Sequence, residues 1–252
     1  MEVTFLGTGT SQGIPIIGCD CKICQSDDNK DIRLRSSVYI KYNNSNIIID
    51  TGPDFRQQAL KEKIKNLDFI LYTHAHKDHT GGIDDIRSFN FFLKKTIPIY
   101  GNKKTIDQII RDYSYIFKKN NYKALPKISI NYISDKFEKN GIIINPIKVK
   151  HHKLDVLGYR IKNFTYITDA NFISNKEKEK IIGSDVLVIN CLQKENHISH
   201  FNLDEALSII KELKVKKAYL THISHNLGLH KETSKKLPKN VKIAYDSLKI
   251  SI

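Results

Sequence analysis

The sequence predicts an α/β domain in which β-sheets are covered by helices on their outer faces. Three observations predict this class. Short apolar runs come one after another near the N-terminus, and further along such runs alternate with longer segments of helical periodicity. No Pro- or Gly-rich linker, low-complexity tract or repeat divides the 252 residues. Because helices that alternate with strands bury the faces of a sheet, we expect one layered domain over residues 1–252.

The predicted strands are short runs of β-branched, aliphatic and aromatic residues bounded by polar turns. The sequence Asn43-Asn44-Ser45, between the second and third of these runs, is typical of a hairpin turn. In chain order, the predicted strands cover residues 2–6, 37–42, 46–50, 68–72, 97–100, 128–133, 142–149, 157–161, 164–168, 185–190 and 216–221, and two more lie near the C-terminus around 241–251.

The predicted helices are longer segments in which apolar residues recur at the spacing of an amphipathic helix. Two of them begin with a capping-box pattern, because Ser174 stands three residues before Glu177 and Asn202 stands three residues before Glu205. In chain order, the predicted helices cover residues 54–64, 83–93, 103–118, 175–182 and 203–213, and a short one follows residue 230.

Composition and charge restrict the compartment and the partners. Hydrophobic residues make up 40% and charged residues 27% of the chain, which is ordinary for a protein with a buried core. No segment approaches the ~20 apolar residues that span a bilayer, and the first residues lack a signal-peptide pattern, so we expect a cytoplasmic protein without a membrane partner. The net charge of +14 favours an anionic substrate, whereas the dispersed basic residues do not favour a nucleic-acid partner.

The strongest functional signal is the sequence His74-Ala75-His76-Lys77-Asp78-His79, directly after the apolar run 67–72. Loops that follow strands commonly carry metal ligands, because the sheet holds them in place. Four ligand-type side chains within six residues suit two adjacent ions better than one. Imidazole and carboxylate ligands together suit Zn²⁺, Mn²⁺ or Fe. The motif therefore predicts a dinuclear metal site.

This motif resembles the HxHxDH signature of the metallo-β-lactamase superfamily, and the rest of the chain resembles the superfamily's other motifs in the same order. The resemblance extends from Leu6 to His225 and implies a metallo-β-lactamase fold, an αββα four-layer sandwich of two mixed sheets flanked by helices. It also implies that Asp50 hydrogen-bonds the metal-binding loop. The implied metal ligands are His74, His76, Asp78, His79, His151, Asp169 and His222, with Asp169 as the bridging carboxylate.

The third histidine ligand can be either His151 or His152, because adjacent residues of a strand face opposite sides. Segment 151–159 resembles HGKLxxxGY, a stretch of the PhnP-like branch of the superfamily in which the residue after the ligand is small. On that resemblance we favour His151, and His152 remains the alternative.

Three of the four cysteines, Cys19, Cys21 and Cys24, lie within six residues. In a reducing compartment such a cluster is more typical of a metal site than of disulfides. Three thiolates need one further ligand for a closed tetrahedral Zn²⁺ site, and His225 is the natural fourth. A structural zinc loop near 19–24 together with the dinuclear motifs resembles the PhnP and PqqB-type proteins. The remaining Cys191 ends an apolar run and is expected in the core.

A further histidine, His200, lies in segment 197–203, which resembles the PhnP-like segment where a histidine faces the substrate near the leaving group. As a free imidazole it would protonate a departing alkoxide. We therefore expect His200, together with the ligand Asp78, to be catalytic. His197 is expected to be solvated, and His230 to be structural or exposed.

The resemblance implies a metal-dependent phosphodiesterase. One ion would bind His74, His76 and His151, and the other would bind Asp78, His79 and His222. A hydroxide that bridges the ions would attack the phosphorus of a small phosphodiester, cyclic forms included. The expected cofactors are two active-site Zn²⁺ or Mn²⁺ ions and one structural Zn²⁺. A homodimer is expected from the resemblance alone.

Three other functions remain open from the sequence. A tRNase Z-like RNA 3′-processing endonuclease shares the histidine set but carries a protruding arm, and the strongest candidate for an arm, residues 102–127, favours a helix instead. A PqqB-like accessory protein would lack a working dinuclear site, which the full ligand set argues against. Lactonase or β-lactamase chemistry is the third, and the cysteine cluster disfavours a secreted lactamase.

Overall fold

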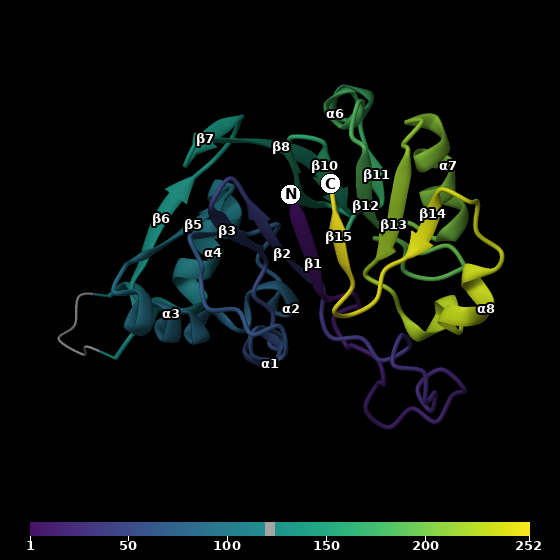
Figure 1. Ribbon diagram of the computed structural model, residues 1–252, viewed down its shortest axis with the longest axis horizontal. Helices are drawn as coiled ribbons and strands as arrows, with labels where there is room; N and C mark the ends of the chain where they lie inside the picture. Colours follow the sequence, from purple (N-terminus) through teal and green to yellow (C-terminus); the bar gives the residue numbers. More distant parts are fainter. Residues whose placement is uncertain (119–123) are drawn as a thin grey trace.

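The computed structural model describes residues 1–118 and 124–252, which form two β-sheets packed face to face (Figure 1). The chain completes the first sheet, except for one strand, before it enters the second. The last strand then returns to pair with the first strand of the chain, so the two termini lie side by side (Figure 1).

The first sheet has the strand order β15-β1-β2-β3-β4-β5-β6. Its strands β1 to β3 are antiparallel neighbours, whereas β3 to β6 run parallel. Asn43 and Asn44, with φ of 50° and 59°, make the predicted hairpin turn between β2 and β3. The strands are β1 (Glu2–Gly7), β2 (Ser37–Tyr42), β3 (Ser45–Ile49), β4 (Phe69–Leu71), β5 (Ile97–Gly101), β6 (Ile128–Tyr132) and β15 (Lys249–Ser251).

The second sheet has the order β11-β8-β9-β10-β12-β13-β14, with β7 paired to β8. Its strands β8, β9 and β10 are antiparallel neighbours, whereas β10, β12, β13 and β14 run parallel. The strands are β7 (Phe137–Lys139), β8 (Ile142–His151), β9 (Leu154–Ile161), β10 (Phe164–Tyr166), β11 (Phe172–Ile173), β12 (Val186–Asn190), β13 (Lys217–Thr221) and β14 (Val241–Ile243).

Three hydrophobic clusters separate the layers of the molecule. One lies between the two sheets and includes Phe5, Phe69 and Tyr159. A second lies between the first sheet and its helices, and a third lies between the second sheet and its helices. The expected arrangement of two mixed sheets flanked by helices is therefore confirmed. The helices are α1 (Phe55–Lys61), α2 (Lys77–Thr80), η1 (Ile83–Asp85), α3 (Ile86–Leu93), α4 (Lys103–Asp112), α5 (Ser114–Phe117), α6 (Asn175–Ile181), α7 (Leu203–Glu212), η2 (His225–Leu227) and α8 (His230–Ser234).

The prediction of one continuous helix over residues 103–118 was wrong in one respect, because the structure divides this segment into α4 and α5. Tyr113 between them has φ −114° and ψ 37°, which is not helical. Its hydroxyl donates to the backbone oxygen of Thr80, so tertiary contact rather than local propensity sets the break. The end of the candidate arm segment 102–127 falls partly on residues 119–123, which lie outside the described residues. No helix in the described part of the chain is both long and apolar enough to cross a bilayer.

The two predicted capping boxes have different outcomes. Asn202 begins α7 with a full box, in which its side chain accepts from the backbone N–H of Glu205 and the Glu205 carboxylate accepts from the Asn202 backbone N–H. Ser174 caps α6, but the Glu177 carboxylate accepts from the backbone N–H of Lys148 in β8 instead. Because α6 packs on the second sheet, the Glu177 carboxylate binds the backbone of β8 and does not complete the capping box.

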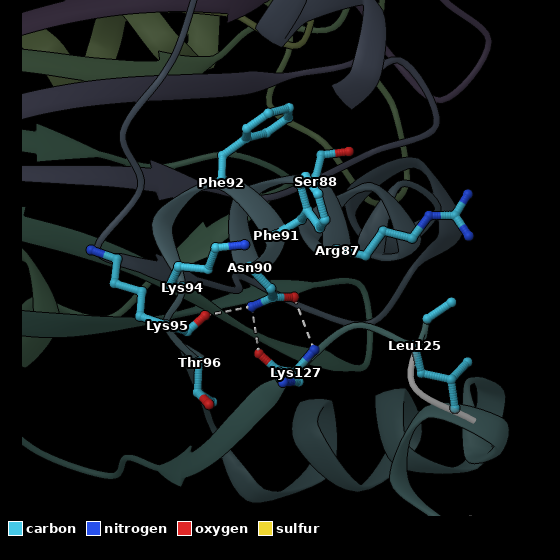
Figure 2. A pocket seen from close by; sticks show the side chains of 11 residues that line it. Arg87, Ser88, Asn90, Phe91, Phe92, Lys94, Lys95, Thr96, Leu125 and Lys127 are labelled. Carbon is cyan, nitrogen blue, oxygen red and sulfur yellow. Dashed lines mark hydrogen bonds between the residues drawn. The ribbon is translucent and has the colours of Figure 1, made fainter. Parts of the chain in front are cut away.

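A buried asparagine connects α3 to the edge of the first sheet (Figure 2). The Asn90 amide donates to the backbone oxygens of Lys95 and Lys127, both at 2.9 Å, and accepts from the Lys127 backbone N–H. These bonds hold the starts of β5 and β6 together. The exposed rings of Phe91 and Phe92 stand beside them and line a hollow of about 530 Å³.

Candidate metal centres

The residues expected to bind metal lie where strands of both sheets end at one edge of the molecule. His74 follows β4 in the first sheet, and His151 is the last residue of β8 in the second. Asp169 follows β10, and His222 follows β13. Since each sheet fixes its own strand ends, side chains far apart in the sequence are held together with little freedom.

Three of these polar residues turn the backbone sharply at a strand end. Asp50, Asp169 and His222 have φ of 63°, 53° and 55°, in the left-handed region. Residues other than glycine are uncommon there, and such conformations are concentrated at functional sites. The surrounding structure must over-determine this geometry, because each residue is buried.

One donor group consists of Asp78, His79, Asp169 and His222, whose ligand atoms all lie within 4.8 Å of one another. The Nε2 atom of His79 is 3.1 Å from Asp78 Oδ2 and 3.2 Å from Asp169 Oδ2. The Nε2 atom of His222 is 3.2 Å from Asp169 Oδ1. These are the residues expected at one of the two ions, with Asp169 as the shared carboxylate.

A second donor group adjoins the first through Asp169. It contains His151, Asp169 and His200, again with ligand atoms within 4.8 Å of one another. The ring centroid of His76 lies 4.6 Å from that of His74 and 5.4 Å from that of His151. The structure thus brings the expected set of His74, His76 and His151 together and places His200 among them.

The unpaired nitrogen atoms buried in the donor set indicate that it fits a divalent metal. Among the described residues, His74 Nε2 has no hydrogen-bond partner, and His79 Nε2 faces carboxylates without hydrogen-bond geometry. Leaving a buried polar atom unpaired costs roughly 1–3 kcal/mol, so such atoms are rare unless something else binds them. A metal ion at each donor group would satisfy these nitrogen atoms, His74 Nε2 at one ion and His79 Nε2 at the other. Imidazole with carboxylate suits Zn²⁺ or Mn²⁺.

Asp50 makes the hydrogen bonds to the metal-binding loop that the resemblance implies. Its Oδ1 accepts from the Thr73 backbone N–H, and its Oδ2 accepts from the Thr73 hydroxyl, both at 2.8 Å. The same Oδ2 lies 2.7 Å from His79 Nδ1. This contact orients the ring so that its Nε2 faces the donor group.

The electrostatics of three of the histidines favour the neutral form that metal ligands need. Burial lowers the pKa of His74 well below its usual value and that of His222 to about 4. Burial likewise lowers the pKa of His151. At His79, by contrast, burial is outweighed by the carboxylates of Asp78, Asp169 and Asp50, which raise the pKa well above its usual value in the absence of metal. Burial alone would raise the pKa of Asp169, but His222 and His79 hold it well below its usual value. Neutral imidazole beside ionised carboxylate is the form that binds metal.

The choice between His151 and His152 is made by the hairpin of β8 and β9. His151 directs its ring to the cluster, and its Nδ1 is 2.9 Å from the backbone oxygen of Ser199. His152 begins the turn with φ 55° and is exposed, and its backbone N–H donates to Asn171. The favoured residue is therefore the one that faces the other donors.

His200 is buried inside the site rather than at its rim. Its Nε2 is 3.1 Å from Asp169 Oδ1, and its ring stacks on His222 with centroids 5.0 Å apart. Its Nδ1 lies 3.1 Å from the Ser199 hydroxyl and 3.2 Å from His197 Nδ1. The exposed His197 therefore contacts His200, a neighbour that sequence reasoning alone did not indicate. His230 is buried and lies 3.3 Å from the Arg33 guanidinium, in keeping with a structural role.

The cysteine loop forms a separate donor group with His225. The Nδ1 atom of His225 is 3.4 Å from the Sγ atoms of Cys19 and Cys21 and 3.6 Å from that of Cys24. The backbone N–H of Cys24 lowers the pKa of Cys21 to about 6, which favours the thiolate. Three sulfur atoms around one imidazole nitrogen suit a closed tetrahedral Zn²⁺ site. Cys191 is fully buried in the core of the second sheet.

Comparisons with known proteins agree with this geometry. Residues 45–223 match the family model of the β-lactamase superfamily domain. An octanoyltransferase of Porphyromonas gingivalis is 34% identical over 256 residues, a match covering 100% of this chain and 52% of that protein, so this chain spans about half its length. A ribonuclease Z of Staphylococcus epidermidis is 24% identical over 297 residues, covering 93% of this chain and 92% of the relative. A crystal structure of a new diphosphatase from the PhnP family has a TM-score of 0.93 and 39% identity, covering 100% of this chain and 97% of the other.

Three findings establish the family of this chain. The matched superfamily domain spans every residue of the two donor groups, from His74 to His222. The likeness at 39% identity covers the whole chain, the cysteine loop included. The fold and the order of its motifs agree with both. The chain belongs to the PhnP family of the metallo-β-lactamase superfamily.

Proposed function

We propose that this protein is a metal-dependent phosphodiesterase that hydrolyses a small phosphodiester, cyclic forms included. The observation that carries the proposal is the convergence of imidazole and carboxylate donors from both sheets in two groups that share Asp169. Two bound Zn²⁺ or Mn²⁺ ions would supply hydroxide at neutral pH and stabilise the charge that grows on the phosphoryl oxygens. The high positive charge of the chain, +14, favours an anionic substrate of this kind.

The side chains of the protein would position these groups and move one proton. Asp50 holds the His79 ring, and the Ser199 backbone oxygen holds the His151 ring, so each presents its Nε2 to the site. His200 stands beside Asp169, where its imidazole could hold a proton for the leaving oxygen. Proton donation matters when the leaving group is a basic alkoxide.

Hydrolysis of a diphosphate bond is a second candidate, favoured by the 39% identity with the PhnP-family diphosphatase. A diphosphate presents a phosphorus atom with anionic oxygens, as a phosphodiester does, and the same donor groups would stabilise the charge on both. Its leaving group is a weakly basic phosphate, which depends less on a proton donor. The two substrates therefore differ in their need for His200.

The other named relatives are less suitable guides to the reaction. This chain spans about half of the Porphyromonas gingivalis octanoyltransferase, so octanoyl transfer is not carried over to it. Acyl transfer through a covalent intermediate needs an activated nucleophile, whereas Cys191 is buried in the core and the other thiols face His225. A ribonuclease Z activity would need a surface for tRNA. In the segment that was considered for a protruding arm, helices rather than an arm cover residues 103–112 and 114–117.

A substrate panel tests the proposal directly. The zinc- or manganese-loaded protein should hydrolyse bis(p-nitrophenyl) phosphate and adenosine 2′,3′-cyclic monophosphate at least about tenfold faster, in kcat/KM, than p-nitrophenyl phosphate or a lactone. A precursor tRNA should keep its length. ADP-ribose in the same panel decides between the phosphodiester and the diphosphate. Preference for the lactone, or shortening of the tRNA, would contradict the proposal.

The role of His200 is tested by varying the leaving group. Nitrophenolate leaves without help, whereas a ribose alkoxide needs protonation. The His200→Ala variant should therefore lose about 10²-fold more activity on the 2′,3′-cyclic nucleotide than on bis(p-nitrophenyl) phosphate. Its metal content, measured by elemental analysis, should equal that of the wild type. Equal losses on both substrates would exclude proton donation, and lost metal would identify His200 as a ligand alongside His151 and Asp169.

A further inference from the structure

A groove leads away from the metal centre along α4. Its first hollow, of about 590 Å³, is lined by His76 and Lys77 of the metal-binding loop and by Lys104 and Arg111 of α4. A second hollow of about 450 Å³ includes Tyr132 in its wall. Lys104 and Asp155 line both hollows, so the two meet at this pair. Because His76 also belongs to the donor cluster, the groove begins at the metal centre.

The pair at the middle of the groove is weakly held. Lys104 Nζ lies 3.2 Å from Asp155 Oδ2, and the two side chains are 80% and 43% exposed. Ion pairs this exposed contribute little, because water screens them. Asp155 also forms an ion pair with Lys150. Lys104 can therefore turn to a ligand phosphate without leaving the carboxylate unpaired.

A second cation stands on the same face of α4. Arg111 follows Lys104 by two helical turns, roughly 10 Å along the axis at 1.5 Å per residue. Its guanidinium donates to the neutral side-chain oxygen of Gln108 at 2.6 Å. Lys77, by contrast, lies 2.9 Å from Asp112. Arg111 thus brings a planar cation into the hollow nearest the metal centre. Its hydrogen bond is to a neutral side chain, although Asp107 and Asp112 also line this hollow, and such a planar cation suits a phosphate.

An aromatic ring lines the far hollow. Tyr132, the last residue of β6, is 54% exposed. Its hydroxyl donates to Asp107 Oδ1 at 3.0 Å, which fixes the ring against α4. Nucleobases stack on exposed aromatic rings of this kind without regard to base identity.

We propose that this groove binds the part of the substrate beyond the scissile phosphate, and that this part is a nucleotide. Lys104 and Arg111 would bind a second phosphate, and Tyr132 would stack on the base. The inference rests on the proposed phosphodiesterase function and names its substrate class, a nucleotide diester with a further phosphate.

Three chromogenic diesters with the same leaving group test the inference. They are methyl p-nitrophenyl phosphate, thymidine 5′-(p-nitrophenyl phosphate), and the latter compound with an added 3′-phosphate. Each step adds one feature that the groove would bind, first the nucleoside and then the second phosphate. For the wild type, kcat/KM should rise at least about tenfold at each step, which is about 1.4 kcal/mol.

Variants assign each step to its side chain. Tyr132→Ala should lower the ratio of kcat/KM for the second substrate to kcat/KM for the first towards one. The double variant, with Lys104→Gln and Arg111→Gln, should lower the ratio of kcat/KM for the third substrate to kcat/KM for the second towards one. Lys216→Gln is the matched control, because Lys216 is also 80% exposed and paired with an aspartate, Asp185, at the other end of the second sheet. It should leave both ratios at their wild-type values.

The ratios separate the possible failures. A partly unfolded variant lowers every kcat/KM by the same factor and leaves the ratios unchanged. If the wild type hydrolyses the methyl ester but shows no rise at either step, or the variants keep the wild-type ratios, the groove inference is wrong and the phosphodiesterase proposal stands. If none of the three diesters is hydrolysed, the proposed function fails, and the inference that rests on it fails as well.

Discussion

The Asp169→Ala variant should lose at least about a thousandfold in kcat on a phosphodiester, roughly 4 kcal/mol of activation free energy. Asp169 belongs to both donor groups, with Oδ2 at 3.2 Å from His79 Nε2 and Oδ1 at 3.2 Å from His222 Nε2. Alanine at this buried position would remove one ligand from each ion. The metal content per chain, measured by elemental analysis, should fall together with the activity.

A companion variant and a control make this result specific. Asp78→Ala removes a carboxylate from one donor group only, and it should also cost at least about a thousandfold. Asp185→Ala removes an aspartate at the start of β12, away from the strand ends that carry the site, and should keep both metal and activity. Near-normal activity in either Asp169→Ala or Asp78→Ala would show that the assignment of the metal ligands is wrong.

The Cys21→Ser variant should lose about one zinc per chain and unfold at a lower temperature. Closed zinc sites contribute to folding, and a loss of ~2 kcal/mol would lower Tm by roughly 5 °C in a domain of this size. The sulfur atom of Cys21 lies 3.4 Å from His225 Nδ1, so the site joins two segments about two hundred residues apart in the chain. Elemental analysis and a thermal melt measure both effects.

The other cysteine of the chain provides the control. Cys191→Ala removes a thiol that is fully buried in the second sheet, and it should lower Tm through lost packing without changing the zinc content. Zinc loss with Cys21→Ser alone would therefore identify the loop as the binding site. Zinc content that is unchanged in Cys21→Ser would rule out the structural zinc.

Without the family resemblance, the parts of the site that the residues could predict are mainly those with local causes. The motif from His74 to His79 sits directly after a strand, and α2 begins within it at Lys77, so its donors are placed by a few consecutive residues. The long strands and helices were likewise visible, since a buried face imposes its periodicity on the sequence. The short strands β7 and β11 were missed, because they are only partly buried and lie in no long apolar run, whereas β4 and β10, which are also short, are fully buried and lie in apolar runs.

What the sequence by itself determined was the chemistry of the donors, the alternation of strands and helices, and hence the class of the fold. The family resemblance implied which distant residues share the dinuclear site, but only the tertiary structure decided how they are brought together. The register of β8 with β9 directs His151, not His152, to the cluster, because a shift of one residue would reverse every side chain. The contact of Tyr113 with Thr80 divides α4 from α5, and the packing of α4 beside the metal-binding loop forms the groove. Such contacts join residues that are distant in the chain, and no local pattern of residues encodes them.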